Sequence, residues 1–89
     1  MQDTTNTDRA GWALSALTDF VAETGVDTAR DAIADLIANL LHLARGRGLD
    51  VDLLLDQTGR LMTEEFAEDP EGDMTSVQER FRELLPYDS

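Results

Sequence analysis

Nearly all the side chains that could do chemistry in this chain of 89 residues are carboxylates. The sequence has nineteen Asp and Glu, seven Arg and one His, and neither Lys nor Cys. Carboxylates bind hard cations such as Mg²⁺ and Ca²⁺, or they attract a cationic partner. The absence of Cys excludes disulfide bonds, a thiolate nucleophile and a Cys-bound zinc. Ser15 and Ser76 have no visible base to activate them, so the sequence does not favour nucleophilic catalysis.

The single histidine, His42, could ligate a metal together with Asp35, because residues seven apart share one face of a helix. Two ligands are too few for a closed metal site, and no nearby motif supplies the others. We therefore favour a histidine that is hydrogen-bonded at a helix surface or at a subunit seam.

Three groups of acidic residues have spacings that could suit a metal. Asp27, Asp31 and Asp35 line one side of a helix and could form an edge for a divalent cation. They also lie in the first half of that helix, where the helix dipole favours negative charge. The acids of 50–56 and 69–73 resemble calcium loops only in part, because the first group lacks the turn glycine and the second is a short alternating run. The sequence predicts neither a metal site nor a cofactor.

The densest acidic segment runs from Glu64 to Asp73, where six of ten residues are acidic and none is basic. Such a run is usually a solvated helix end and loop, but on an anionic domain it is also a place for a cationic partner to dock. Because solvated charges contribute little to stability, reversing the three Glu of 64–68 is expected to leave the fold intact. The residues predicted to bind the partner are the acids of this run and two that precede it: Glu64, Glu65, Glu68, Asp69, Glu71, Asp73, Asp52 and Asp56.

The net charge of −12, with a pI near 4.1, excludes several classes of function. So acidic a domain repels nucleic acid and anionic lipid, and it attracts basic surfaces. The most apolar run, 32–44, is too short to span a bilayer, and residues 1–8 lack the pattern of a signal peptide. We therefore expect a cytoplasmic protein that contacts neither nucleic acid nor membrane directly. Arginine without lysine is typical of a high-GC genome or of a salt-loaded cytoplasm, and both explanations stay open.

The elements that would position these residues are helices throughout. Apolar residues recur at helical spacing, and no strand pattern or repeat is visible. The predicted fold class is all-α: a small bundle of three main helices plus a short C-terminal helix. The helices are expected at 8–23, 28–45, 50–68 and 75–85. They would form one domain at 8–86, between a disordered N-terminal tail at 1–7 and a C-terminal tail at 87–89.

Local signals mark several helix ends. Gly25 suits a left-handed C-cap of the first helix. Thr75 and Gln78 fit a capping box for the last one. Gly59 lies in the middle of the third helix, where a close helix crossing would explain it. On the first helix, Trp12 belongs to the apolar stripe.

The second helix is apolar over more than half its circumference. We expect it to be the central helix, packed antiparallel against the third. Leu43, Leu49 and Leu53 lie off the stripes that face the chain's own core, so a second copy or a partner should cover them, and we expect a homodimer. The residues predicted at the centre of the core are Ile33, Leu36, Ile37, Leu40 and Leu41.

The segment from Asp31 to Ala44, followed by Gly48-Leu49-Asp50-Val51-Asp52, resembles a helix pair of the MazG-type all-α nucleotide pyrophosphatases. That family binds magnesium through an E-E-x-x-E motif and a later E-x-x-D. When Asp35 is aligned with the last Asp, Ala32 takes the place of the metal-binding Glu. The acids of the first helix do not reproduce E-E-x-x-E. The resemblance implies a fold neighbour rather than an enzyme.

The segment from Asp35 to Asp50 also matches a "D-L-x-x-x-L-x-H-x-A … G-h-D" helical hairpin. In this it resembles small uncharacterised acidic proteins encoded by phages and other mobile elements of high-GC bacteria. That resemblance implies a genomic setting and a fold. Small acidic proteins from such settings include inhibitors of host defence, anti-CRISPR proteins among them, some of which mimic DNA by presenting carboxylates in place of its phosphates.

These observations favour a non-enzymatic, acidic protein-binding module. It would occupy a basic surface of a partner, such as a nucleic-acid-binding protein, and so inhibit or regulate it. One alternative is a metal-dependent nucleotide hydrolase that is completed by dimerisation and uses Asp31 and Asp35. A second alternative is a structural or assembly domain in which the charge only maintains solubility.

Overall fold

The computed structural model describes residues 4–70 and 72–88. Within these ranges it contains four helices and no strand: α1 (Asn6–Thr24), α2 (Ala29–Gly46), α3 (Val51–Glu68) and α4 (Thr75–Leu84). The predicted all-α fold, with three main helices and a short C-terminal helix, is confirmed. The sole β-type contact in this part of the chain is an isolated bridge between Thr28 and Tyr87.

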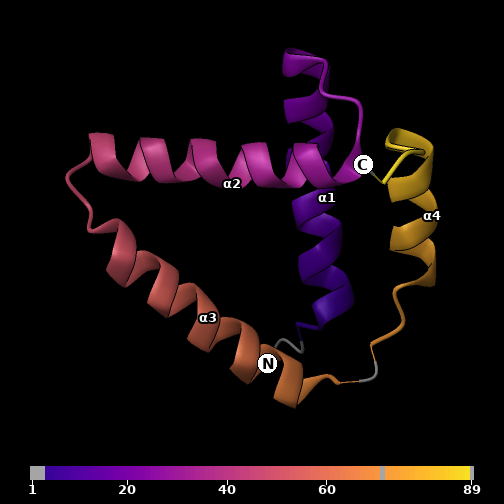
Figure 1. The fold of residues 1–89 in the computed structure, drawn as a ribbon. Helices are drawn as coiled ribbons and strands as arrows, with labels where there is room; N and C mark the ends of the chain where they lie inside the picture. Colours follow the sequence, from indigo (N-terminus) through magenta and orange to yellow (C-terminus); the bar gives the residue numbers. More distant parts are fainter. Residues whose placement is uncertain (1–3, 71, 89) are drawn as a thin grey trace.

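The four helices form an open frame rather than a closed cylinder (Figure 1). The α2 helix crosses the C-terminal half of α1, α4 lies beside α1, and α3 runs obliquely from the far end of α2 back toward the start of α1. The predicted antiparallel packing of 28–45 against 50–68 is wrong, because α2 and α3 diverge from the turn that joins them. The radius of gyration is 14.3 Å, whereas a compact chain of this length has about 12 Å.

The first helix begins two residues earlier than predicted, with Thr5 as its N-cap. The Thr5 hydroxyl accepts a hydrogen bond from the backbone N–H of Asp8, and the Asp8 carboxylate accepts one from the backbone N–H of Thr5. This reciprocal capping box satisfies donors that the first turn would leave free. At the other end Gly25 adopts the left-handed conformation, with φ of 73°, as predicted.

The second helix begins at the predicted place, but its cap comes from the C-terminal segment. Thr28 precedes the helix and makes no side-chain cap. Instead the backbone N–H groups of Ala29 and Arg30 donate to the carbonyl oxygens of Tyr87 and Asp88, at 2.8 and 2.9 Å. Residues 87 and 88, which the sequence assigned to a tail, therefore fasten the end of the chain to the start of α2.

The core is a small corner where α1, α2 and the end of α4 meet. Its centre consists of Leu17, Leu85 and Ala32, the last of which is fully buried. A small residue at position 32 lets α2 approach both neighbours closely. Side chains that are partly buried against this centre come from α1, α2, α4 and the α1–α2 turn: Phe20, Val21, Val26, Ala29, Leu36, Phe81 and Leu84.

The predicted position of the core is wrong. Ile33, Ile37 and Leu40 are exposed by 42%, 48% and 54%, and Leu36 and Leu41 are only partly buried. The wide apolar arc of α2 was interpreted as the sign of a central helix. In the structure much of that arc faces the opening of the frame, because α3 stands away from it.

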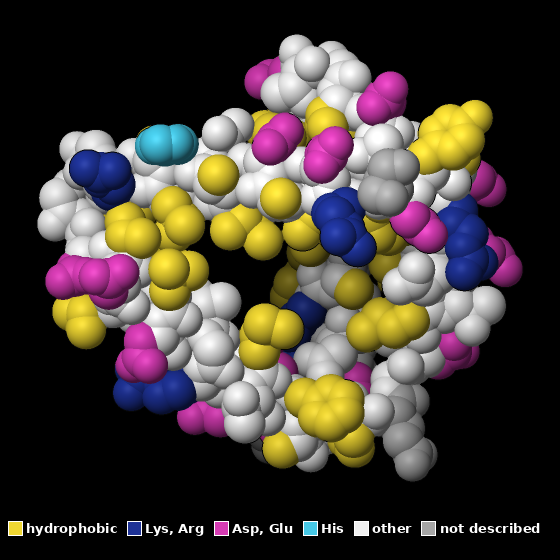
Figure 2. Space-filling model, in the orientation of Figure 1, with side chains coloured by type: hydrophobic (Ala, Val, Ile, Leu, Met, Phe, Trp, Pro, Cys, Tyr) yellow, Lys and Arg dark blue, Asp and Glu magenta, His cyan; other side chains and the backbone are white. Residues whose placement is uncertain are grey.

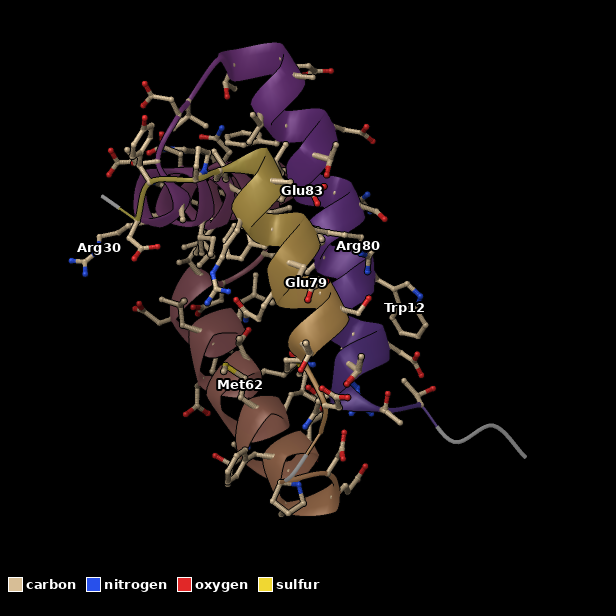
Figure 3. All side chains as sticks on the ribbon, turned by 90° about the vertical axis from the view of Figure 1, so that its right-hand side faces the viewer. Trp12, Arg30, Met62, Glu79, Arg80 and Glu83 are labelled. Carbon is tan, nitrogen blue, oxygen red and sulfur yellow. The ribbon has the colours of Figure 1, made fainter. Side chains whose placement is uncertain are left out.

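Three other local predictions are also corrected. An added Cβ at Gly59 would meet no atom within 4 Å, so no helix crosses closely there. The Thr75 side chain makes no cap at the start of α4, and Asp73 accepts a hydrogen bond from the Thr75 backbone N–H instead. Trp12 is 60% exposed and points away from the other helices (Figure 3). None of the helices described is long and apolar enough to cross a membrane.

Candidate partner-binding surfaces

Glu65, one of the acids predicted to bind a partner, joins the end of α3 to the start of α1. Its carboxylate forms an ion pair with Arg9, at 3.1 Å from Oε2 to Nε, and both side chains are about two-thirds buried. The backbone carbonyl of Glu65 accepts a hydrogen bond from the Asn6 side-chain amide at 2.9 Å. Reversing the charge at Glu65 would therefore remove this ion pair, whereas the sequence treats Glu65 as a solvated charge.

Asp69 and Asp73 make further contacts at the same junction. The Asp69 carboxylate accepts a hydrogen bond from the backbone N–H of Asn6 at 2.9 Å. The backbone carbonyl of Asp73 accepts one from the Thr7 hydroxyl at 2.8 Å. Two hydrogen bonds from Thr75, the backbone one first and the side-chain one second, hold the pKa of the Asp73 carboxyl below its usual value. These two acids thus act within the chain.

The other predicted acids lie along the outer side of α3. Asp52, Asp56, Glu64 and Glu68 are all exposed. With Arg60 between them they follow one another every four residues, so they wind slowly along one side of the helix over about 24 Å. Arg60 forms an ion pair with Asp56 at 3.4 Å. We call these four acids the outer stripe. Glu71 lies outside the residues that the structure describes.

The middle of the outer stripe lies across the helix from the junction, whereas Glu68 follows Glu65 by three residues and lies beside it. Asp56 precedes Glu65 by nine residues, which places the two on opposite sides of α3 at 3.6 residues per turn. One set of carboxylates is therefore used inside the molecule, and the other faces solvent. In the sequence these carboxylates belong to one acidic segment, and composition alone does not show which of them face solvent.

The candidate ligands of the metal alternative lie on the outside of α2. Asp31, Asp35 and His42 are exposed, and Figure 2 shows the histidine on the side of α2 away from the opening of the frame. Within residues 4–70 and 72–88, no three His, Asp or Glu side chains come together as a metal site would require.

A second surface, which the sequence did not predict, is an apolar hollow of about 380 Å³ inside the frame. Its lining from α2 consists of four of the five residues expected in the core: Ile33, Leu36, Ile37 and Leu40. Figure 2 shows apolar side chains gathered around the opening, with most carboxylates at the outer edges of this face. Side chains of α1 and α4 complete the lining: Ala10, Ala13, Leu14, Leu17, Val77, Gln78 and Phe81.

The apolar side chains of α3 do not fill this hollow. Leu61, Met62 and Phe66 are exposed by 46%, 66% and 64%, and no residue of α3 is buried. None of the residues that line the hollow comes from α3. The signal for this surface was present in the sequence as the unusual apolar width of 28–45, but periodicity does not reveal whether an apolar face is covered.

Comparisons of the chain with protein-family models, with curated proteins and with solved structures gave no match.

Proposed function

We propose that this chain is an acidic protein-binding module that occupies a basic surface of a partner and thereby inhibits or regulates it. The observation that carries the proposal is the outer stripe. Its four carboxylates are exposed along a single rigid helix, and Arg60 is the one basic residue that interrupts them. Charges that a helix holds at fixed spacing lose little conformational entropy on binding. Such an arrangement favours complementarity with a fixed set of basic residues.

The length of the outer stripe suits a partner that binds nucleic acid. The four carboxylates extend over about 24 Å, a distance that holds roughly seven phosphates of one DNA strand at 3.4 Å each. A basic groove built for a phosphate backbone would therefore meet acidic groups along its length. The chain would compete with the nucleic acid for that groove.

The test compares two charge reversals that alter the net charge equally. Glu64→Lys with Glu68→Lys changes the outer stripe and leaves Glu65 and its ion pair in place. Asp19→Lys with Glu23→Lys makes the same change on α1, where both side chains are exposed and also lie four residues apart. The affinity of a basic protein captured by the immobilised chain is then measured for both variants.

We expect the α3 variant to weaken binding by about 10-fold or more at 0.1 M salt and the α1 variant to leave it nearly unchanged. Binding of the unaltered chain should weaken steeply with salt, since the Debye length falls from about 10 Å at 0.1 M to about 3 Å at 1 M. Equal losses in both variants would indicate attraction by net charge alone and contradict the proposal. An unchanged affinity in both would also contradict it.

A further inference from the structure

The chain exposes more surface than a compact monomer of its size. Its accessible area is 6920 Å², whereas a monomer of 9.8 kDa exposes about 5,200 Å². The excess, about 1,700 Å², is roughly twice what one partner buries in a standard interface and falls in the range of obligate dimers. This excess accords with the open frame and the large radius of gyration.

Two apolar faces that are unpartnered within the chain belong to this exposed surface. One is the hollow lined by α1, α2 and α4, and the other is the side of α3 that carries Leu61, Met62 and Phe66. The chain cannot bring these faces together by a simple swing of α3. That helix is tied to α2 by a short turn at one end and to Asn6 and Arg9 at the other.

Covering these faces would add to the stability of the chain, because its own buried core is small. Only six hydrophobic residues are buried in the part of the chain described, which is a small core for a domain that has no disulfide. A second copy meets this need in a fixed ratio, as it does in dimers whose monomers are not stable alone. A second copy can also approach the hollow without strong charge repulsion, because the lining of the hollow contains no charged residue. Two chains of net charge −12 can therefore meet with most carboxylates at their outer edges (Figure 2).

We infer that a second copy of this chain packs on the open frame, with the apolar side of its α3 entering the hollow. In a two-fold dimer the same contact occurs twice, since α3 of each copy fills the hollow of the other. One interface then covers both unpartnered faces. Asp56 and Glu64, in the middle part of the outer stripe, lie across α3 from its apolar side and stay accessible, so this inference does not depend on the proposed function.

Sedimentation of three matched variants tests the inference. Ile37→Glu places a charge in the hollow, Met62→Glu places one on the apolar side of α3, and Trp12→Glu places one on an exposed apolar residue that points away from the frame (Figure 3). The unaltered chain should sediment as a dimer. The first two changes should each raise the dissociation constant by about 30-fold or more, and the third should leave it nearly unchanged. A monomer for the unaltered chain, or equal effects of all three variants, would overturn the inference.

Cysteine pairs provide a second measurement that does not require destabilised variants, because the chain has no cysteine of its own. Ile37→Cys and Met62→Cys are made in separate chains, which are mixed and mildly oxidised. The expected product is a disulfide between one chain of each kind, and Trp12→Cys in place of Met62→Cys should not form it.

The double variant, with Ile37→Cys and Met62→Cys in one chain, distinguishes the remaining arrangement. A bond within a monomer would show that α3 closes on the hollow of its own chain, and this would overturn the inference. Reversal of Glu64 alone, which lies across α3 from Met62 and Phe66, should leave the dimer intact. Loss of partner binding in that variant would therefore concern the proposed function alone.

Discussion

The corner where α1, α2 and α4 meet differs sharply from the arm formed by α3. At the corner Leu17, Ala32 and Leu85 are buried, and the C-terminal backbone adds hydrogen bonds to the start of α2. The arm has no buried residue and is held at its far end by one ion pair and a few hydrogen bonds to the first turn of α1. Apolar packing therefore stabilises one region of this chain, and polar contacts position the other.

This difference shows that the type and helical spacing of an apolar residue do not reveal whether it is buried in the core or exposed. Leu17 and Leu40 are both leucines on the apolar stripes of amphipathic helices, yet Leu17 is almost fully buried and Leu40 is 54% exposed. The first contributes to the fold of the chain. The second faces the hollow, where a second copy would bury it.

The largest expected effect is the loss of stability on Leu17→Ala. Removing this side chain from the packed corner should lower the free energy of unfolding by about 2–5 kcal/mol, through lost burial and the cavity that remains. Leu40→Ala, at a residue that the sequence placed in the core, should cost about 1 kcal/mol in a monomer, since half of its side chain already meets water. Urea denaturation at a concentration where the chain sediments as a monomer measures both. Equal losses would contradict the contrast between the two regions.

The sequence predicted the secondary structure better than the packing. Helix periodicity and turn residues depend on near neighbours, so the four helices and the left-handed Gly25 were predictable. The angle between α2 and α3 depends on contacts between residues that are distant in the sequence, such as Asn6 with Glu65. No local sequence pattern predicts this angle. For this reason the predicted core was placed on the wrong side of α2.

The candidate site shows the same limit. The sequence indicated where carboxylates are dense, but composition cannot show which of them have partners within the chain. Glu65 pairs with Arg9, 56 residues earlier in the chain. The nine residues between Asp56 and Glu65 were a local signal that these two acids lie on opposite sides of the helix, and that spacing is visible in the sequence.

A smaller effect is expected from Asn6→Ala, which tests whether polar contacts alone position the arm. The Asn6 amide donates to the carbonyls of Glu65 and Asp69, at 2.9 and 3.2 Å. Its loss should lower the free energy of unfolding by about 1 kcal/mol and speed amide exchange in the last turn of α3. Thr63→Ala is the matched control, because its hydroxyl bonds only to the carbonyl of Gly59 in the same helix. Unchanged exchange at the end of α3 in the Asn6 variant would show that other contacts hold the arm.

The smallest effect concerns the pH response of the loop that joins the arm to α4. The pKa of Asp73 is lowered from its usual 3.8, first by the backbone N–H of Thr75 and second by the Thr75 side chain. Because the pKa is lower in the folded chain, the stabilisation by Asp73 is complete above pH 3.8 and is lost as the pH falls through the folded value. Thr75→Val removes the hydroxyl but keeps the N–H, so the pKa should rise and still remain below 3.8. An NMR titration of the Asp73 carboxyl carbon measures this shift. A pKa that reached 3.8 in the Val variant would show that the hydroxyl, rather than the backbone, holds Asp73 in its charged form.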